Sequence, residues 1–338
     1  MSISFVKNIY GETILPLTEE GKYESILSVI EADGFSPQVY YLLKEKGMLG
    51  NTPLFFQEKL SKLYQESFFL NLYIKNQQTR ILESFEENRI EVMPLKGTHF
   101  AEKYYGDIGA RSTSDIDLLV NIKDLSEAVR IVKSLGFTIE QEQIKNHFHI
   151  SLGKNILGSF IPLTVELHWD LVCGNTSNLN VADFWNEALP FGGNRYVKEL
   201  TVFHTFYFMC LHGWRHNMDS PKYFLDIIMV AEVLGNKIDY QKLYAIAKQH
   251  QTLKRIIRTL SIVAYHFPHL DFLMTLPKKR TNMWWEAHPI VKDTQPNIFK
   301  KYLDFLDYQF FSFDTAKHSV MEVMNYMGSG LERKSRNK

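Results

Sequence analysis

The sequence has too few cysteines and too little excess charge for several common classes of protein. Its 338 residues include two cysteines, Cys173 and Cys210, which supply neither a disulfide framework nor a C-x-x-C metal motif. We therefore expect reduced thiols in a cytoplasmic protein. Lysine plus arginine and aspartate plus glutamate both number 38, so the formal net charge is zero. A general nucleic-acid-binding protein carries a basic excess, so nucleic acid is not an expected partner.

Long apolar runs are also missing. No stretch approaches the roughly 20 apolar residues that cross a bilayer, and the N-terminal residues lack the pattern of a signal peptide. The sequence shows neither an internal repeat nor a low-complexity segment. We therefore expect no membrane partner. The sequence leaves the oligomeric state open.

The composition is that of an ordinary globular protein, with 45% hydrophobic, 22% charged and 14% aromatic residues. Helical periodicity dominates both ends of the chain, and strand patterns gather in the middle. This predicts an α+β fold with a small mixed sheet and flanking helices. The expected parts are a helical segment over 1–89, the mixed core over 90–175, a helical domain over 176–330 and a mobile charged tail over 331–338.

Within the core, apolar and alternating segments predict five strands separated by glycine turns and two helices. The helices are expected at 98–105 and 124–135. The expected strands are Ile90 to Leu95, Asp115 to Val120, Phe137 to Gln141, His147 to Leu152 and Leu163 to Leu171.

Two acids on the second of these strands are the main chemical signal. In the run DIDLLV, Asp115 and Asp117 fall on one face, and Ile116 and Leu118 on the other. Adjacent carboxylates repel, so such a pair usually holds a cation or is well solvated. Oxygen ligands favour Mg²⁺ or Mn²⁺. The alternative is a surface strand with two solvated acids.

The last expected strand adds a third carboxylate. Glu166, His168 and Asp170 alternate with apolar residues and share one face. A carboxylate on a neighbouring strand would complete the site begun by the paired aspartates. The alternative is the polar outer face of an edge strand.

The motif order resembles a known family. Leu95-Lys96-Gly97, then Arg111, then the DIDLLV strand is similar to the bacterial family labelled uncharacterised nucleotidyltransferase, which resembles the DNA polymerase β-like nucleotidyltransferase superfamily. The likeness covers roughly residues 36–235. The wider superfamily usually has Gly-Ser or Gly-Gly in place of Lys96-Gly97, a shorter gap to the acids and aspartate as the third acid. Further matches are Leu135-Gly136-Phe137, Glu166-Leu167-His168, Leu211-His212 and Leu225-Asp226.

The resemblance implies an enzyme that moves a nucleoside monophosphate from a nucleoside triphosphate such as ATP to a hydroxyl of a small-molecule or protein acceptor. It implies three carboxylates that hold two Mg²⁺ or Mn²⁺ ions. Asp115 and Asp117 would bind both ions, and Glu166 would bind the catalytic one. Neither the base nor the acceptor is specified by the sequence.

The same resemblance implies a phosphate-binding turn. Gly97 lets the backbone approach a phosphate, and Lys96 and Arg111 are donors on turns beside the acids. The alternative role of Lys96 and Arg111 is a structural ion pair with Asp107, with Glu102 or with an aspartate of the site. The adjacent hydroxyl residues Thr98 and Ser114 complete the phosphate-binding candidates.

The acceptor is expected between the strands and the helical segment from Thr201 to Gly235. The candidates there are His212, Lys222 and Asp226, with His168 on the strand side. Lys222 and Asp226 are four residues apart on one helix, so a salt bridge is the alternative. His212 and His216 have the spacing of a zinc pair, but a hydrogen-bonded core histidine is the commoner role.

Two other functions fit the paired acids. One is a D-x-D glycosyltransferase, in which the acids hold a metal on a nucleotide sugar. The other is a non-catalytic nucleotide-binding protein on the same fold. The Lys96-Gly97 turn and the helical N-terminal segment favour the nucleotidyltransferase, because the glycosyltransferase more often has a long N-terminal α/β domain.

Overall fold

The structure is a computed structural model that describes residues 2–11, 19–140, 148–156, 161–235, 238–280, 285 and 298–336. Two expected strand ends, Gln141 and His147, lie outside the described residues. Among the helices of these ranges, none has both the length and the apolar character of a membrane span.

The centre of the fold is a five-stranded mixed sheet, as the sequence predicted. Its order is β1-β2-β5-β4-β3. The β2–β5 pair is parallel, and the other pairs are antiparallel. The strands are β1 Val92–Pro94, β2 Asp115–Val120, β3 Thr138–Ile139, β4 His149–Lys154 and β5 Leu163–His168.

Helices pack on both faces of this sheet, and one of them links it to the N-terminal part. Helix α4 (Leu54–Glu87) is 34 residues long and begins directly after Pro53. Its second half packs through residues such as Ile81 and Phe85 on the face that carries Ile116. Its first half belongs to a separate core shared with the N-terminal and C-terminal helices. The apolar residues along this one helix therefore pack into two separate hydrophobic cores.

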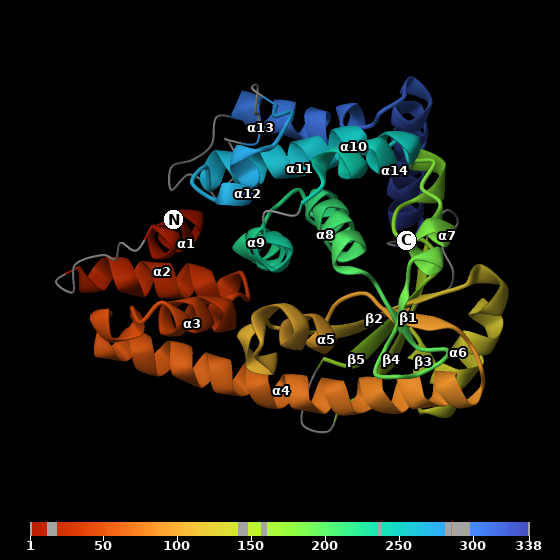
Figure 1. The fold of residues 1–338 in the computed structure, drawn as a ribbon, viewed down its shortest axis with the longest axis horizontal. Coiled ribbons are helices and arrows are strands. Elements are labelled where there is room, and N and C mark those ends of the chain that lie inside the picture. Colours follow the sequence, from red (N-terminus) through yellow and green to blue (C-terminus); the bar gives the residue numbers. More distant parts are fainter. Residues whose placement is uncertain are drawn as a thin grey trace.

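The remaining helices lie in the parts of the chain predicted to be helical, in addition to the two predicted within the core. Figure 1 shows α4 running beneath the sheet, α8 between the sheet and the C-terminal helices, and α9 beside α8 and above α5. The first is α1 (Ser2–Tyr10). The others are α2 Glu20–Ala32, α3 Ser36–Glu45, α5 Thr98–Phe100 continued by a π-helical turn Ala101–Tyr105, α6 Leu125–Ser134, α7 Val181–Asn186, α8 Val202–Arg215, α9 Pro221–Leu234, α10 Tyr240–Gln249, α11 Leu253–His266, α12 Asp271–Met274, α13 Ile298–Leu306 and α14 Ala316–Arg336.

A short hairpin precedes α8, and the C-terminal segment of the chain is helical. The hairpin pairs β6 (Leu189–Pro190) with β7 (Lys198–Glu199). Helix α14 continues to Arg336, six residues into the segment expected to be a tail from 331 onward. The last two residues, 337 and 338, are outside the described ranges. Mobility of this segment stays a prediction.

A buried histidine makes the helical core sensitive to acid. His266 of α11 packs against the rings of Phe224 and Trp285. Burial, assisted by the charge of Lys7, lowers the pKa of His266 to about 4. The unfolded state therefore binds more protons between the ordinary histidine pKa and this value, and folding stability falls as the pH falls through that window.

We expect the free energy of unfolding to drop by about 2 kcal/mol on this account between pH 6.5 and pH 5. The variant His266→Phe, which cannot be protonated, should show a shallower loss. Urea unfolding of both proteins at the two pH values measures the difference. Equal losses in wild type and variant would contradict the assignment.

Candidate active site

Three carboxylates meet on the face of the sheet opposite α4. The parallel register of β2 and β5 pairs Asp117 directly with Glu166. Asp115 lies two residues before Asp117 on the same face, and carboxylate oxygens of all three residues lie within 4.8 Å of one another. The structure thus brings together the acids that the sequence singled out.

Lys96 lies between the paired aspartates. Its Nζ atom is 3.2 Å from Asp115 Oδ2 and 2.9 Å from Asp117 Oδ2. Burial opposes a charged lysine, but the two carboxylates outweigh it and raise the pKa of Lys96. Lys96 therefore adopts the ion pair with the aspartates that was the alternative to phosphate binding, and it relieves the repulsion between the two acids.

Asp117 is almost fully buried, with 1% of its surface exposed. Its Oδ1 atom also accepts a hydrogen bond from His168 Nε2 at 3.1 Å. Burial favours the neutral acid, but Lys96 and His168 together hold the pKa of Asp117 well below its usual range. The carboxylate is therefore charged at neutral pH.

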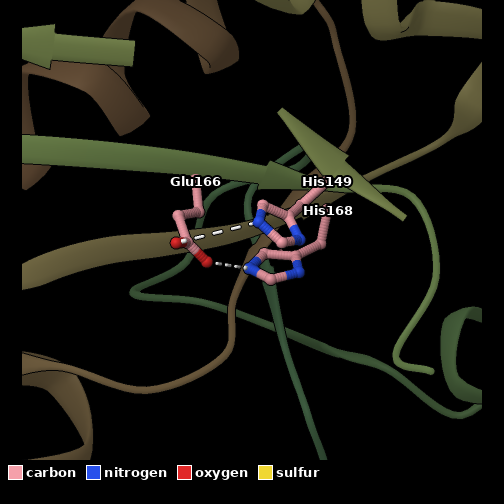
Figure 2. Close-up of side chains that lie close together, drawn as sticks. All are labelled: His149, Glu166 and His168. Atoms are coloured by element: carbon pink, nitrogen blue, oxygen red, sulfur yellow. Dashed lines mark ion pairs between the residues drawn. The ribbon is translucent and has the colours of Figure 1, made fainter. Parts of the chain in front are cut away.

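Glu166 sits beside two imidazole rings. Figure 2 shows the side chains of His149 and His168 on the same side of Glu166. His168 Nε2 lies 3.2 Å from Glu166 Oε2, and His149 Nε2 lies 3.9 Å from Glu166 Oε1. Burial raises the pKa of Glu166, but the His168 hydrogen bond outweighs this effect and lowers it. Glu166 is therefore ionised too.

These residues fit a hard divalent cation. Three ionised or ionisable carboxylates supply oxygen ligands of the type that Mg²⁺ and Mn²⁺ prefer. Their oxygens are close enough together to share one ion or a pair of ions. The nearby Lys96 compensates only one of the three negative charges. A bound cation would compensate the rest.

The turn before these acids requires glycine. Gly97 has φ +85°, a backbone conformation that residues with a side chain rarely adopt. A Cβ atom there would lie 3.5 Å from Thr113 Cγ2 and 3.6 Å from the carbonyl oxygen of Asp115. Backbone strain at this positive φ, more than crowding of a Cβ atom, therefore explains why residue 97 is a glycine.

The two hydroxyl residues predicted to bind phosphate differ in their surroundings. Thr98 is buried and donates a hydrogen bond to Gln78 of α4 at 2.9 Å. Ser114 is exposed and donates to Asp115 Oδ1 at 3.3 Å. Thr98 therefore faces the helix beneath the sheet, while Ser114 stays beside the acids.

Arg111 forms a buried ion pair with Asp226 of α9. Its Nε and Nη2 atoms donate to the two carboxylate oxygens at 2.9 to 3.0 Å. Tyr105 donates a further hydrogen bond to Asp226 at 3.0 Å. Burial disfavours the charged guanidinium, but Asp226 raises the pKa of Arg111. This geometry supports the structural alternative for both residues, with a partner that the sequence analysis did not consider for Arg111.

The loop that carries Arg111 is fixed by α4. The buried Asn71 side chain donates to the carbonyl oxygens of Ile108 and Arg111 at 2.6 and 2.7 Å. Tyr64 donates to Asp107 at 2.7 Å. These contacts explain why Asp107 is not the partner of Arg111.

A cavity of about 140 Å³ lies between the sheet and α8. It has the position expected for the acceptor pocket, between the acids and the helical segment. Lys222 and Asp226 are not in its lining. The lining residues are Lys96, Asp115, Asp117, Phe148, Glu166, His168, Leu171, Phe208, Leu211, His212, Arg215 and His216.

His212 of α8 and His216, which directly follows the helix, present neutral imidazoles to this cavity. Burial, followed by the charge of Lys96, holds the pKa of His212 well below its ordinary value. Burial, followed by the charge of Arg215, lowers the pKa of His216 to about 4. His216 stacks on Tyr223, with ring centroids 4.9 Å apart. Among the described residues, neither histidine belongs to a group of three side chains that could hold a metal.

Sequence reasoning missed Arg215. It is an exposed residue on the rim of the cavity, and its guanidinium lies 4.4 Å from the centre of the Phe148 ring. Its position three residues after His212 places both side chains on one face of α8. That spacing was the available signal for a second cation that lines the same cavity as Lys96.

The chain matches the model of one protein family. The model of a family described as uncharacterised nucleotidyltransferase matches residues 19–268, which extend from α2 through the sheet to the end of α11. Among solved structures, the chain is similar to the crystal structure of ANT(2″)-Ia in complex with adenylyl-2″-tobramycin. The TM-score is 0.37 and the identity 15%, over 52% of this chain and 97% of that chain. Comparison with curated proteins gives no match.

Proposed function

This chain belongs to the uncharacterised nucleotidyltransferase family and is a transferase of that kind, and from that premise we propose that it moves a nucleoside monophosphate from a nucleoside triphosphate to an acceptor hydroxyl. The acceptor is a small molecule or a protein side chain. The observation that carries this proposal is the meeting of Asp115, Asp117 and Glu166 at the wall of one cavity.

The three carboxylates would hold one or two Mg²⁺ or Mn²⁺ ions. When bound, such ions stabilise charge on the α-phosphate and lower the pKa of the attacking hydroxyl. Lys96 compensates the aspartates before substrate arrives. Incoming phosphate oxygens compete for the same ammonium group, so Lys96 acts first as a counter-ion and then as a phosphate donor.

The size of the cavity and the arginine at its rim indicate how a nucleotide would be placed. Ligand pockets commonly measure roughly 300–1,000 Å³, more than the 140 Å³ found here. The cavity therefore accommodates the reacting phosphates, and the sugar and base lie toward its mouth. Arg215 at that rim takes the phosphate-binding role that the sequence analysis gave to Arg111.

Helix α8 supplies the acceptor side. The acceptor oxygen has to approach within about 3–3.5 Å of the α-phosphorus, opposite the leaving pyrophosphate. His212 faces the acids across the cavity and is neutral. A neutral imidazole can accept from or donate to a hydroxyl without adding charge. We therefore assign His212 to the orientation of the acceptor.

The variant His212→Ala tests that assignment. We expect kcat/KM for the acceptor to fall roughly 10-fold, the scale of one lost hydrogen bond to a reacting group. NTP affinity and melting temperature should be unchanged. A parallel loss of melting temperature would show instead that His212 is a packing residue.

Thermal melting distinguishes the nucleotidyltransferase from the glycosyltransferase. We expect an NTP to raise the melting temperature when Mg²⁺ or Mn²⁺ is present and to have little effect without it. Stabilisation by a nucleotide sugar alone would favour the glycosyltransferase. Helical structure throughout the described residues before β1 supports the first outcome.

A further inference from the structure

Two histidines extend the carboxylate site along the sheet. His149 of β4 and His168 of β5 are directly opposite each other in the antiparallel register. Glu166 lies two residues before His168 on the same face, and ligand atoms of the three side chains are all within 4.8 Å of one another. Figure 2 shows both imidazoles beside the Glu166 carboxylate. The register of two strands therefore builds a second cluster that shares Glu166 with the first.

The donors of this cluster differ from those of the paired aspartates. Two imidazole nitrogens and one carboxylate suit borderline transition ions, whereas Mg²⁺ prefers oxygen alone. We propose that His149, Glu166 and His168 bind a transition-metal dication such as Mn²⁺ or Zn²⁺, next to the oxygen site of Asp115 and Asp117. Rigid strands, not loops, carry every ligand of this site.

The spacing of the ligand atoms suits a shared cation, which would replace the proton that His168 Nε2 donates to Asp117 and Glu166 in this structure. Nitrogen and oxygen ligands lie about 2.0–2.2 Å from zinc, so neighbouring ligand atoms are roughly 3–3.5 Å apart. The separations from Glu166 are 3.2 Å to His168 Nε2 and 3.9 Å to His149 Nε2. The second value exceeds a hydrogen-bond length. Binding of one shared ion would bring His149 Nε2 closer to Glu166 Oε1 than it is in this structure.

The inference deepens the proposed function and rests on it for its catalytic consequence. If one of two ions is held partly by imidazole, Mn²⁺ supports nucleotidyl transfer better than Mg²⁺. The metal site itself can be tested without turnover. This separation allows the two proposals to fail independently.

Pulsed electron paramagnetic resonance of bound Mn²⁺ gives the direct readout. The chelator-treated full-length protein is titrated with Mn²⁺ alone, and magnetic coupling to nitrogen-14 reports imidazole bound to the ion. We expect coupling in the wild type. In His149→Gln, the coupling should weaken and Mn²⁺ affinity should fall at least ~10-fold, the least that loss of a supporting group costs a metal site. Affinity for Mg²⁺, measured by calorimetry, should be unchanged.

The matched control is His216→Gln, which removes another imidazole from the same cavity but not from the cluster. It should retain the nitrogen coupling. Absence of coupling in the wild type, or equal Mn²⁺ affinity in wild type and His149→Gln, overturns the inference whatever the folding of the variant. If NTP still stabilises the protein with Mg²⁺ in that case, the proposed function stands.

Discussion

Replacing Asp117 by asparagine is expected to lower kcat for nucleotidyl transfer by roughly 10³-fold, the scale on which removal of one preorganised electrostatic group acts. Asp117 is ionised, buried and within reach of both other acids. Asparagine keeps its size but not its charge. The measurement is single-turnover transfer with saturating NTP and Mg²⁺.

The stability of this variant has an expected direction as well. Adjacent acids on a strand predict that loss of one charge relieves repulsion, but Lys96 and His168 already compensate Asp117. We therefore expect a lower melting temperature, and the assay should run well below it. Asp124→Asn, which removes the same charge outside the cavity, is the control. Transfer by Asp117→Asn at the wild-type rate would show that the site is misassigned.

Asp226→Ala should destabilise the fold by about 3–5 kcal/mol, the cost of leaving one charge of a buried pair uncompensated. The charge in question is the guanidinium of Arg111, which is 4% exposed. Activity should fall in parallel with stability. Urea unfolding gives the free-energy difference, and transfer is assayed on the same samples.

A double variant shows whether Arg111 and Asp226 form a structural ion pair or bind substrate. Arg111→Met combined with Asp226→Leu replaces both charges by apolar groups and should recover most of the lost stability, because buried pairs often tolerate this exchange. Asp226→Ala with wild-type stability but no transfer would contradict the account. That result would indicate that Asp226 binds the acceptor.

Local patterns predicted the strand of the paired acids, because alternation of acid and apolar residues fixes which side chains share a face. The same rule placed Glu166 and His168 together. The sequence could not assign a role to His149, since its pairing with His168 depends on the register between β4 and β5. That register is set by packing across the whole sheet.

Lys96 and Arg111 had the same description in the sequence: each is a cation on a turn near the acids. The structure separates them because only Lys96 lines the cavity. Arg111 pairs with a residue 115 positions away, and no local signal reports such a contact. Burial of a charge is a tertiary property, so sequence spacing could not decide between phosphate and ion pair.

The central claim is tested most directly by following the two ends of the triphosphate. The protein is incubated with Mg²⁺ or Mn²⁺, a small-molecule extract and either α-labelled or γ-labelled NTP, with Asp117→Asn as the control. The account predicts that the α-label enters an acceptor or the protein itself and that the γ-label leaves as pyrophosphate, with neither event in the variant. Transfer of the γ-label, or label movement that persists in Asp117→Asn, would contradict it.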